Sequence, residues 1–539
     1  MILVTSRDGE SVGIIAREPD FLPRANERMA KYYVTTPIYY VNDVPHIGHA
    51  YTTVAADVLA RHHRRLGDEV FFLTGTDEHG AKIAEAAAKH GVTPKQYVDE
   101  IVERFKTAWH TLEISNDFFI RTSDPQHEAG VAAYLETLYN AGDVYKGVYE
   151  GLYCVGCEQF KTEEDLVNGL CPYHNVAPKW YSEENYFFRL SKYQDALLKA
   201  LTDPTDPHHY VVNPPSRLNE ILGKLRLGLT DVSISRASLT WGVPLPFDRQ
   251  QVVYVWVDAL LNYITAVGYP DRPNEFHHYW PADLHLMAKD ILWFHAILWP
   301  SMLIAGGLPP PREVFAHGFF TIGGQRMSKT LGNAIAPAEL VEKFGADAAR
   351  YLLLTDFPFG TDGDVNLKGF VKRYNAELAN DLGNLLNRTV SMINRYLGGE
   401  IPAAGPSEPA DHEIQAMALA MFDQMNRAFD RLEFVAAADA VRAVVSRANR
   451  FVEETAPWKL AKSDRLRLNT VLATLAETER LIAVALAPFM PTTSERMLDQ
   501  LGATGVLAPT WGCLTPGSHV APQPQPLFPR IETGVVTHH

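Results

Sequence analysis

A strand, a helix and a second strand follow one another near the start of this 539-residue chain. The first strand, KYYVTT at 31–36, is rich in Tyr, Val and Thr, and the second, EVFFLTG at 69–75, is a continuous apolar run. Between them apolar residues recur at helical spacing over 47–66, and Gly67 ends the run. An apolar strand without alternation is typical of a parallel sheet covered on both faces, so the unit predicts an α/β fold.

Along the rest of the chain, the pattern of predicted secondary structure changes twice. Turn-rich sequence begins near Gly142, and the strand-like VVYVWV at 252–257 marks a return to α/β texture, which predicts a Rossmann-like parallel sheet interrupted by an insertion. From about residue 366 amphipathic patterns predict an all-α bundle. The expected ranges are a disordered extension at 1–29, the two sheet halves at 30–142 and 241–322, the insertion at 143–240, a loop and connecting region at 323–365, the bundle at 366–510 and an irregular tail at 511–539.

Composition restricts the partners that the chain can have. A formal net charge of −15 argues against a protein that coats a polyanion with its whole surface, so any nucleic acid would need a local basic patch. No stretch approaches the roughly 18 apolar residues that a membrane span needs, and residues 1–28 fit neither a signal peptide nor a transit peptide. We expect a soluble, cytoplasmic protein.

Three of the four cysteines lie within eighteen residues of one another in the insertion. The pattern is Cys154-x2-Cys157-x13-Cys171-x2-His174. Three thiolates and one imidazole in two close pairs are the ligands that tetrahedral Zn²⁺ prefers, and four protein ligands leave no open position for chemistry. The spacing therefore predicts a structural zinc site in a reducing compartment.

Two histidines flank a glycine in the tetrapeptide that follows the first strand. His46, Gly48 and His49 stand at the first turn of the predicted helix, where unpaired N–H groups favour an anion. Imidazoles there can donate hydrogen bonds to phosphate oxygens, and the carboxyl ends of strands are where open α/β sheets bind ligands. The position predicts a phosphate site.

A second candidate phosphate site is the glycine-flanked loop GGQRMSKTLGN at 323–333. It clusters the side-chain donors of Arg326, Ser328, Lys329 and Thr330, which suits a loop that grips a polyphosphate while charge builds on it.

His-Ile-Gly-His, with Arg-Met-Ser-Lys-Thr about 280 residues later, resembles the two signature motifs of class I aminoacyl-tRNA synthetases. The runs TTPIYYVNDVPHIGHAYTTVAADVLAR, FLTGTDEHG, YVWVDALLNYI and KDILWFHAILWP look like methionyl-tRNA synthetases over residues 31 to about 530, most closely the bacterial type with one zinc knuckle. The resemblance implies a ligase that activates L-methionine with ATP and Mg²⁺ to methionyl-adenylate. It would then transfer the methionyl group to tRNA(Met).

The same resemblance implies roles for individual residues. The implied catalytic residues are His46, His49, Lys329 and Arg326. The implied ATP-binding residues are His46, Gly48, His49, Asp290 and Lys329. Asp77 would hold the substrate ammonium, and the thioether would be enclosed by Ile38, Tyr40, Trp256, Ala259, Tyr263, Ile291 and His295. The implied anticodon-binding residues are Asn384, Arg388 and Trp458, with Arg442, Arg447 and Arg450 as a candidate basic patch.

The sequence departs from the family pattern at a few positions. Arg326 and Thr330 replace the outer residues of the second motif, Ala288 stands where the family has a glycine, and HGFF at 317–320 replaces an aromatic pair with Trp. The short segment after the bundle leads us to expect a monomer. Two alternatives remain open: a class I synthetase for leucine, isoleucine, valine or cysteine, and a non-catalytic tRNA-binding paralogue.

Overall fold

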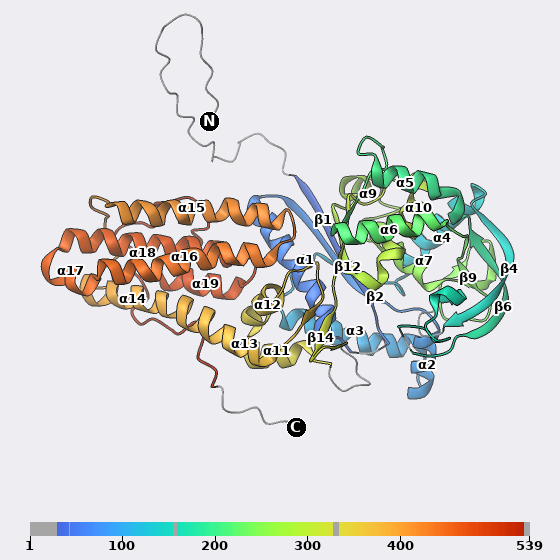
Figure 1. Ribbon diagram of the computed structural model, residues 1–539, viewed down its shortest axis with the longest axis horizontal. Helices are drawn as coiled ribbons and strands as arrows, with labels where there is room; N and C mark the ends of the chain where they lie inside the picture. The colour runs from blue at the N-terminus through green and yellow to red at the C-terminus, as the bar shows by residue number, and fades with distance from the viewer. Residues whose placement is uncertain (1–29, 43, 155–158, 174, 327–333, 533–539) are drawn as a thin grey trace, which may run out of the picture.

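The computed structural model describes residues 30–42, 44–154, 159–173, 175–326 and 334–532. A parallel sheet occupies the middle of the elongated molecule, a helical bundle forms one end, and an antiparallel sheet forms the other (Figure 1). None of the helices described is both long and apolar enough to cross a membrane. The predicted extension at 1–29 lies outside the described residues.

The central sheet has six parallel strands in the order β3-β2-β1-β12-β13-β7. Their bounds are β1 Lys31–Tyr40, β2 Glu69–Asp77, β3 Phe118–Arg121, β7 Val211–Asn213, β12 Leu284–Ala288 and β13 Glu313–His317. Strand order reverses between β1 and β12, and this switch point is where an open α/β sheet leaves a crevice at the carboxyl ends of its strands. The prediction of an interrupted parallel sheet is confirmed.

Helix α1, Ile47–Leu66, connects β1 to β2 and has the bounds that the sequence predicts. Gly67 ends it in the left-handed conformation at φ 90°, which a residue with a Cβ rarely adopts. Buried residues cover most of α1 from Ile47 to His62, because the helix lies between the sheet and the bundle. The first turn of α1 is thereby fixed at the carboxyl end of β1.

The predicted strand at 252–257 is only partly correct. Strand β11, Asp248–Val253, ends there and belongs to a small antiparallel sheet with β9 (Ser235–Arg236) and β10 (Pro244–Leu245). Residues Val255–Leu260 form helix α7 instead. A short apolar run that is buried on every side has no periodicity to distinguish strand from helix, which is why the pattern misled.

The insertion forms a four-stranded antiparallel sheet, β5-β4-β6-β8. Its strands are β4 Val144–Cys154, β5 Gln159–Lys161, β6 Lys179–Phe188 and β8 Val232–Ser233. Strand β7 lies inside the range predicted for the insertion, yet it pairs in parallel with β13 at the edge of the central sheet. The chain therefore returns to the main sheet before the predicted end of the insertion.

The remaining helices of the α/β part cover the sheets and the loops that connect them. They are α2 Ala81–His90, α3 Pro94–Thr111, α4 Pro125–Asn140, α5 Gln194–Thr202, α6 Pro215–Leu227, α8 Asn262–Thr265, α9 Pro273–Tyr279, α10 Trp299–Ala305, α11 Pro337–Phe344 and α12 Ala346–Thr355. A π-helical segment, Phe294–Leu298, precedes α10, and a three-stranded sheet joins β14 (Phe320–Ile322), β15 (Gln325–Arg326) and β16 (Gly363–Asp364).

The C-terminal part is helical, as predicted. After α13 (Leu367–Arg373) and a π-helical segment (Tyr374–Gly383) come α14 Asn384–Leu397, α15 Pro409–Phe429, α16 Phe434–Thr455, α17 Pro457–Ser463, α18 Arg465–Leu486 and α19 Pro491–Gln500. Buried Arg350 of α12 ties this bundle to α1: its Nη2 lies 2.7 Å from Asp57 Oδ2, and its guanidinium donates to the carbonyls of Leu112, Pro488 and Phe489.

Candidate active site

A pocket of about 490 Å³ opens at the switch point between β1 and β12. This volume falls in the range of about 300–1,000 Å³ that is usual for small-molecule sites. The pocket is lined by every predicted ATP-site and methionine-site residue whose side chain the structure describes: Ile38, Tyr40, His46, Gly48, His49, Asp77, Trp256, Ala259, Tyr263, Asp290, Ile291 and His295. Residues up to 257 positions apart in sequence are thus brought to one cavity.

His46 and His49 cap the first turn of α1 reciprocally. Nδ1 of His46 accepts from the Gly48 backbone N–H at 3.1 Å, and Nδ1 of His49 accepts from the backbone N–H of His46 at 3.2 Å. The two rings stack with centroids 3.8 Å apart. Because Nδ1 is the acceptor in both bonds, a neutral ring carries its proton on Nε2. Both imidazoles therefore carry an N–H donor suited to an anionic oxygen at this helix N-terminus.

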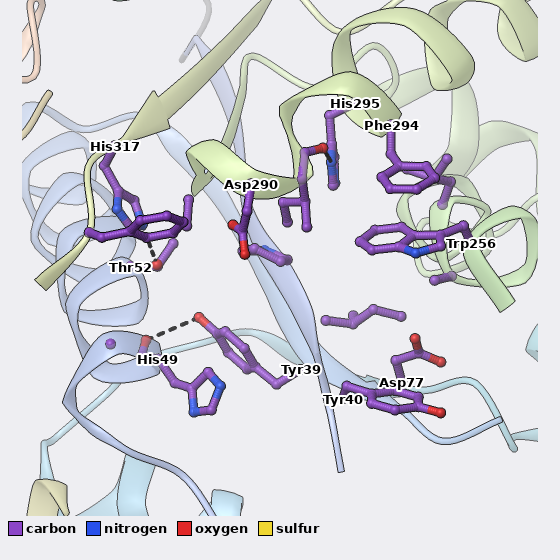
Figure 2. A pocket seen from close by; sticks show the side chains of 18 of the residues that line it. Tyr39, Tyr40, His49, Thr52, Asp77, Trp256, Asp290, Phe294, His295 and His317 are labelled. Atoms are coloured by element: carbon purple, nitrogen blue, oxygen red, sulfur yellow. Dashed lines mark hydrogen bonds between the residues drawn. The ribbon is translucent and has the colours of Figure 1, made fainter. Parts of the chain in front are cut away.

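Aromatic and apolar side chains form the other end of the pocket (Figure 2). Trp256 of α7 stacks on Phe294 with ring centroids 3.9 Å apart and 5° between the planes. Tyr40 and Asp77 are paired in register at the ends of β1 and β2, and Asp77 is only 9% exposed. A single carboxylate beside an apolar wall suits a ligand with one ammonium group and an apolar chain.

Tyr263 and His295, which also line the pocket, hydrogen-bond to each other. His295 Nδ1 lies 3.0 Å from the Ile291 carbonyl, so it carries the proton, and Nε2 accepts from Tyr263 Oη at 2.8 Å. Burial lowers the pKa of His295 to about 4, so the ring is neutral at pH 7. A neutral, fully hydrogen-bonded pair adds polarisable surface without adding charge.

His317 and Thr52 also line the pocket, at the end where His49 lies, and the sequence predicted no role for either (Figure 2). Thr52 Oγ1 lies 2.6 Å from Nε2 of His317. Nδ1 of the same ring hydrogen-bonds to the Gly318 carbonyl at 2.7 Å. Burial lowers the pKa of His317 to about 4. A Cβ on Gly318 would lie 2.2 Å from the Thr361 backbone, so only glycine fits there. The sequence signal that could have predicted a role for His317 is its position at the carboxyl end of a strand, where open α/β sheets bind ligands.

Two departures from the family pattern can be placed in part. Ala288 ends β12 with φ −78° and ψ 154°, a conformation open to any residue, so its methyl group on the pocket wall is what distinguishes it from glycine. Arg326 is the last residue of β15. Ser328, Lys329 and Thr330 lie outside the described residues.

The predicted zinc ligands are described only in part. Cys154 ends β4 and Cys171 begins the turn to Val176, and both side chains are fully buried. Cys157 and His174 lie outside the described residues, and the residues that are described contain no group of three or more side chains arranged to hold a metal. As buried thiols, Cys154 and Cys171 have the side-chain chemistry of two of the four predicted Zn²⁺ ligands.

The predicted anticodon residues lie on the helical bundle. Asn384 and Arg388 are four residues apart on α14, where Arg388 pairs with Glu453 at 2.6 Å, and Trp458 of α17 is 38% exposed. For two of the three arginines of the predicted basic patch, Arg442 and Arg447, the prediction is wrong, because carboxylates neutralise both.

The partners of these two arginines come from other turns and helices. Arg442 pairs with Glu377 and Asp439, and Arg447 pairs with Glu413 and Glu454. Arg450 is exposed.

Comparison with known proteins identifies the family. A family model described as tRNA synthetases class I (M) matches residues 32–177 and 165–390, and one described as the anticodon binding domain of methionyl tRNA ligase matches residues 401–533. The methionine–tRNA ligase of Caldanaerobacter subterraneus subsp. tengcongensis is 48% identical over 93% of this chain and 79% of its own length. That of Streptomyces coelicolor is 46% identical over 93% of this chain and 97% of its own.

Solved structures agree with these relatives. Mycobacterium tuberculosis methionyl-tRNA synthetase in complex with methionyl-adenylate superposes with a TM-score of 0.89 at 40% identity, over 93% of this chain and all of that one. One family accounts for the signature motifs, the interrupted parallel sheet, the helical bundle and the sequence identity over most of the chain. The chain belongs to the methionyl-tRNA synthetase family of class I aminoacyl-tRNA synthetases.

Proposed function

We propose that this chain activates L-methionine with ATP and transfers the methionyl group to tRNA(Met). The observation that carries the proposal is that one pocket, at the β1/β12 switch point, contains both halves of the site. This pocket joins a helix N-terminus capped by two imidazoles to an apolar wall that lies next to the Asp77 carboxylate. One cavity can therefore hold a triphosphate and methionine side by side.

In the first step the methionine carboxylate attacks the α-phosphorus of ATP, and pyrophosphate leaves. His46 and His49 donate to phosphate oxygens through Nε2 as charge builds on them, and Lys329 holds the leaving pyrophosphate. Asp290 binds the nucleotide, and Arg326 assists at the loop. Mg²⁺ accompanies ATP as its counter-ion.

Methionine is held at both of its ends. Asp77 pairs with its ammonium, and the wall of Ile38, Tyr40, Trp256, Ala259, Tyr263, Ile291 and His295 encloses the thioether. Sulfur against aromatic edges gains about 0.3–1.5 kcal/mol, and the chemistry otherwise depends on positioning, so no nucleophilic side chain is needed.

In the second step a terminal ribose hydroxyl of tRNA(Met) attacks the activated carbonyl, and AMP leaves. The anticodon is read on the bundle by Asn384 and Arg388, with Trp458 stacking on an unpaired base. A structural Zn²⁺ held by Cys154, Cys157, Cys171 and His174 stabilises the insertion when bound. The enzyme acts as a cytoplasmic monomer.

The test is exchange of labelled pyrophosphate into ATP with each of a panel of amino acids, followed by charging of a tRNA(Met) transcript. We expect exchange with methionine and charging of that transcript. Exchange with leucine or cysteine instead, or with no amino acid, would reject the proposal. His49→Asn should slow exchange by about a hundredfold or more, since it removes a donor to the transition state.

A further inference from the structure

A fully buried cluster of ionisable side chains lies behind the methionine end of the pocket, outside the lining itself. Its centre is Asp258 of α7, which is 1% exposed. His79 Nδ1 lies 2.7 Å from one of its carboxylate oxygens, and His127 Nε2 lies 3.0 Å from the other. His127 Nδ1 is in turn 2.8 Å from Thr265 Oγ1. Each carboxylate oxygen is thus tied to a different segment of the chain.

These ties join the two parts of the pocket that are proposed to hold opposite ends of methionine. Asp258 lies between Trp256 and Ala259 on α7, and both of these residues line the pocket wall. His79 follows Asp77 by two residues in the turn after β2. The hydrogen bond between His79 and Asp258 therefore fixes the wall relative to the carboxylate.

Helix α7 needs such an anchor. It spans only Val255–Leu260, so it has few internal hydrogen bonds, and a helix this short is not stable by itself. No polar side chain caps its N-terminus. Its position must come from contacts with neighbouring segments, and the one buried charge on it is Asp258.

The turn after β2 is held just as firmly from its other side. The buried carboxylate of Glu78 accepts two hydrogen bonds from Arg121, at 2.7 and 2.9 Å, and one from Thr76 at 2.7 Å. Trp241 Nε1 donates to the Glu78 carbonyl at 2.6 Å, and its ring meets His79 edge-on at 5.1 Å. Of the three residues Asp-Glu-His, the first therefore faces the pocket and the other two are anchors.

The ionisation of the cluster agrees with an anchoring role. Burial opposes charge on His79, but Asp258, Glu128 and Glu78 raise its pKa above the usual value. Burial likewise opposes charge on Asp258, but the charge of His79 and hydrogen bonds from both histidines lower its pKa to about 2. A buried carboxylate held by an imidazolium and a second imidazole is a strong, directional tie.

We propose that Asp258 and His79 are positioning residues for methionine, which set the distance between Asp77 and the Trp256–Ala259 wall and hence the length of side chain that the pocket accepts. The inference rests on the proposed function. If the His79–Asp258 hydrogen bond fixes this distance, the pocket should exclude an amino acid whose side chain is one methylene longer, because the closely packed wall cannot move to accommodate it.

The test compares methionine with ethionine, whose side chain is one carbon longer, in pyrophosphate exchange. One methylene is worth about 10- to 200-fold in kcat/KM in a rigid pocket. Asp258→Asn keeps the shape of the side chain but removes its charge and one of its two acceptor oxygens. We expect this variant to raise the KM for methionine about tenfold and to reduce the methionine-to-ethionine ratio to within about threefold, while the KM for ATP changes by less than about threefold.

A conservative pair and a remote control separate positioning from general damage. His79→Asn places an amide N–H where His79 Nδ1 donates to Asp258, so it should keep more of the length selectivity than His79→Leu, which keeps no donor. Asp347→Asn alters another buried carboxylate, which lies in α12, accepts a hydrogen bond from the backbone N–H of Thr493 in α19 and does not line the pocket. It should reduce stability and leave the selectivity unchanged.

Three outcomes are distinguishable. Wild-type protein that shows no methionine-dependent exchange would reject the proposed function itself. Wild-type exchange combined with unchanged length selectivity in folded Asp258→Asn would overturn the positioning role alone. Equal loss of selectivity in Asp347→Asn would also overturn it, because the effect would then come from lost stability.

Discussion

Glu479→Gln should remove a large pH dependence from the stability of the helical bundle. Glu479 of α18 is fully buried, and its Oε1 accepts a hydrogen bond from Thr389 of α14, the helix that carries Asn384 and Arg388. Within the described part of the chain, Oε2 has no hydrogen-bond partner. Burial, partly offset by the bond from Thr389, raises the pKa of Glu479 to about 8.

The sign follows from the protons bound in each state. Between about pH 4.3, where an unfolded glutamate titrates, and about pH 8, folded Glu479 is protonated while the unfolded chain is ionised. The folded state then binds the extra proton, so its stability falls as pH rises through this window. One proton corresponds to about 1.4 kcal/mol per pH unit, so this group lowers the free energy of unfolding by about 4 kcal/mol between pH 5 and pH 8.

The assay is urea unfolding followed by circular dichroism at several pH values, for wild type and Glu479→Gln. The amide has a constant burial cost, which cancels when only the change with pH is compared. The difference in unfolding free energy between variant and wild type should grow with pH by about 4 kcal/mol from pH 5 to pH 8. A difference that stays constant within about 1 kcal/mol would refute the reasoning, since Glu479 would then ionise as easily in the fold as in water.

Three further predictions follow from single contacts. Arg350→Met removes a cation that pairs with the buried carboxylate of Asp57, so it should lower the free energy of unfolding by about 3–5 kcal/mol. Arg104→Met, which breaks an exposed ion pair, should lower it by under about 1 kcal/mol. Similar losses in the two variants would contradict the prediction. Ala288→Gly should lower the KM for ATP about twofold, or about 0.4 kcal/mol, without changing that for methionine, and a rise would show that the methyl group does not crowd the nucleotide. Burial, followed by the charge of Arg65, lowers the pKa of His62 to about 2, so this histidine is neutral in the fold. As pH falls from 6.5 to 5, the free energy of unfolding of His62→Leu should therefore decrease by about 2 kcal/mol less than that of the wild type. An equal decrease in both proteins would argue against a neutral His62.

Local signals in the sequence were sufficient for the elements that position the nucleotide end. Helix α1 begins and ends where its apolar period and Gly67 predicted, because both termini are determined by residues close in sequence. The switch point then brought His46 and Asp290 to one cavity, although 244 residues separate them. Position at the end of the first strand predicted the role of His46, whereas that of Asp290 was implied by the resemblance to the family.

Contacts between distant polar residues could not be predicted in the same way. The bonds of Asp258 to His79 and His127 span 179 and 131 residues, and no periodicity links such positions. The same limit explains the error over Arg442 and Arg447, whose neutralising partners include carboxylates on other helices. Helix α7 was misjudged because a run buried on all sides reads alike as strand or helix.

The most direct test of the central claim is a crystal structure of this chain with a non-hydrolysable analogue of methionyl-adenylate. The account predicts the ammonium within hydrogen-bond distance of Asp77, the thioether against Trp256 and His295, and the phosphate-bearing half of the analogue next to His46 and His49. An analogue bound elsewhere, or one seated with its methionyl end towards the two imidazoles, would contradict the account.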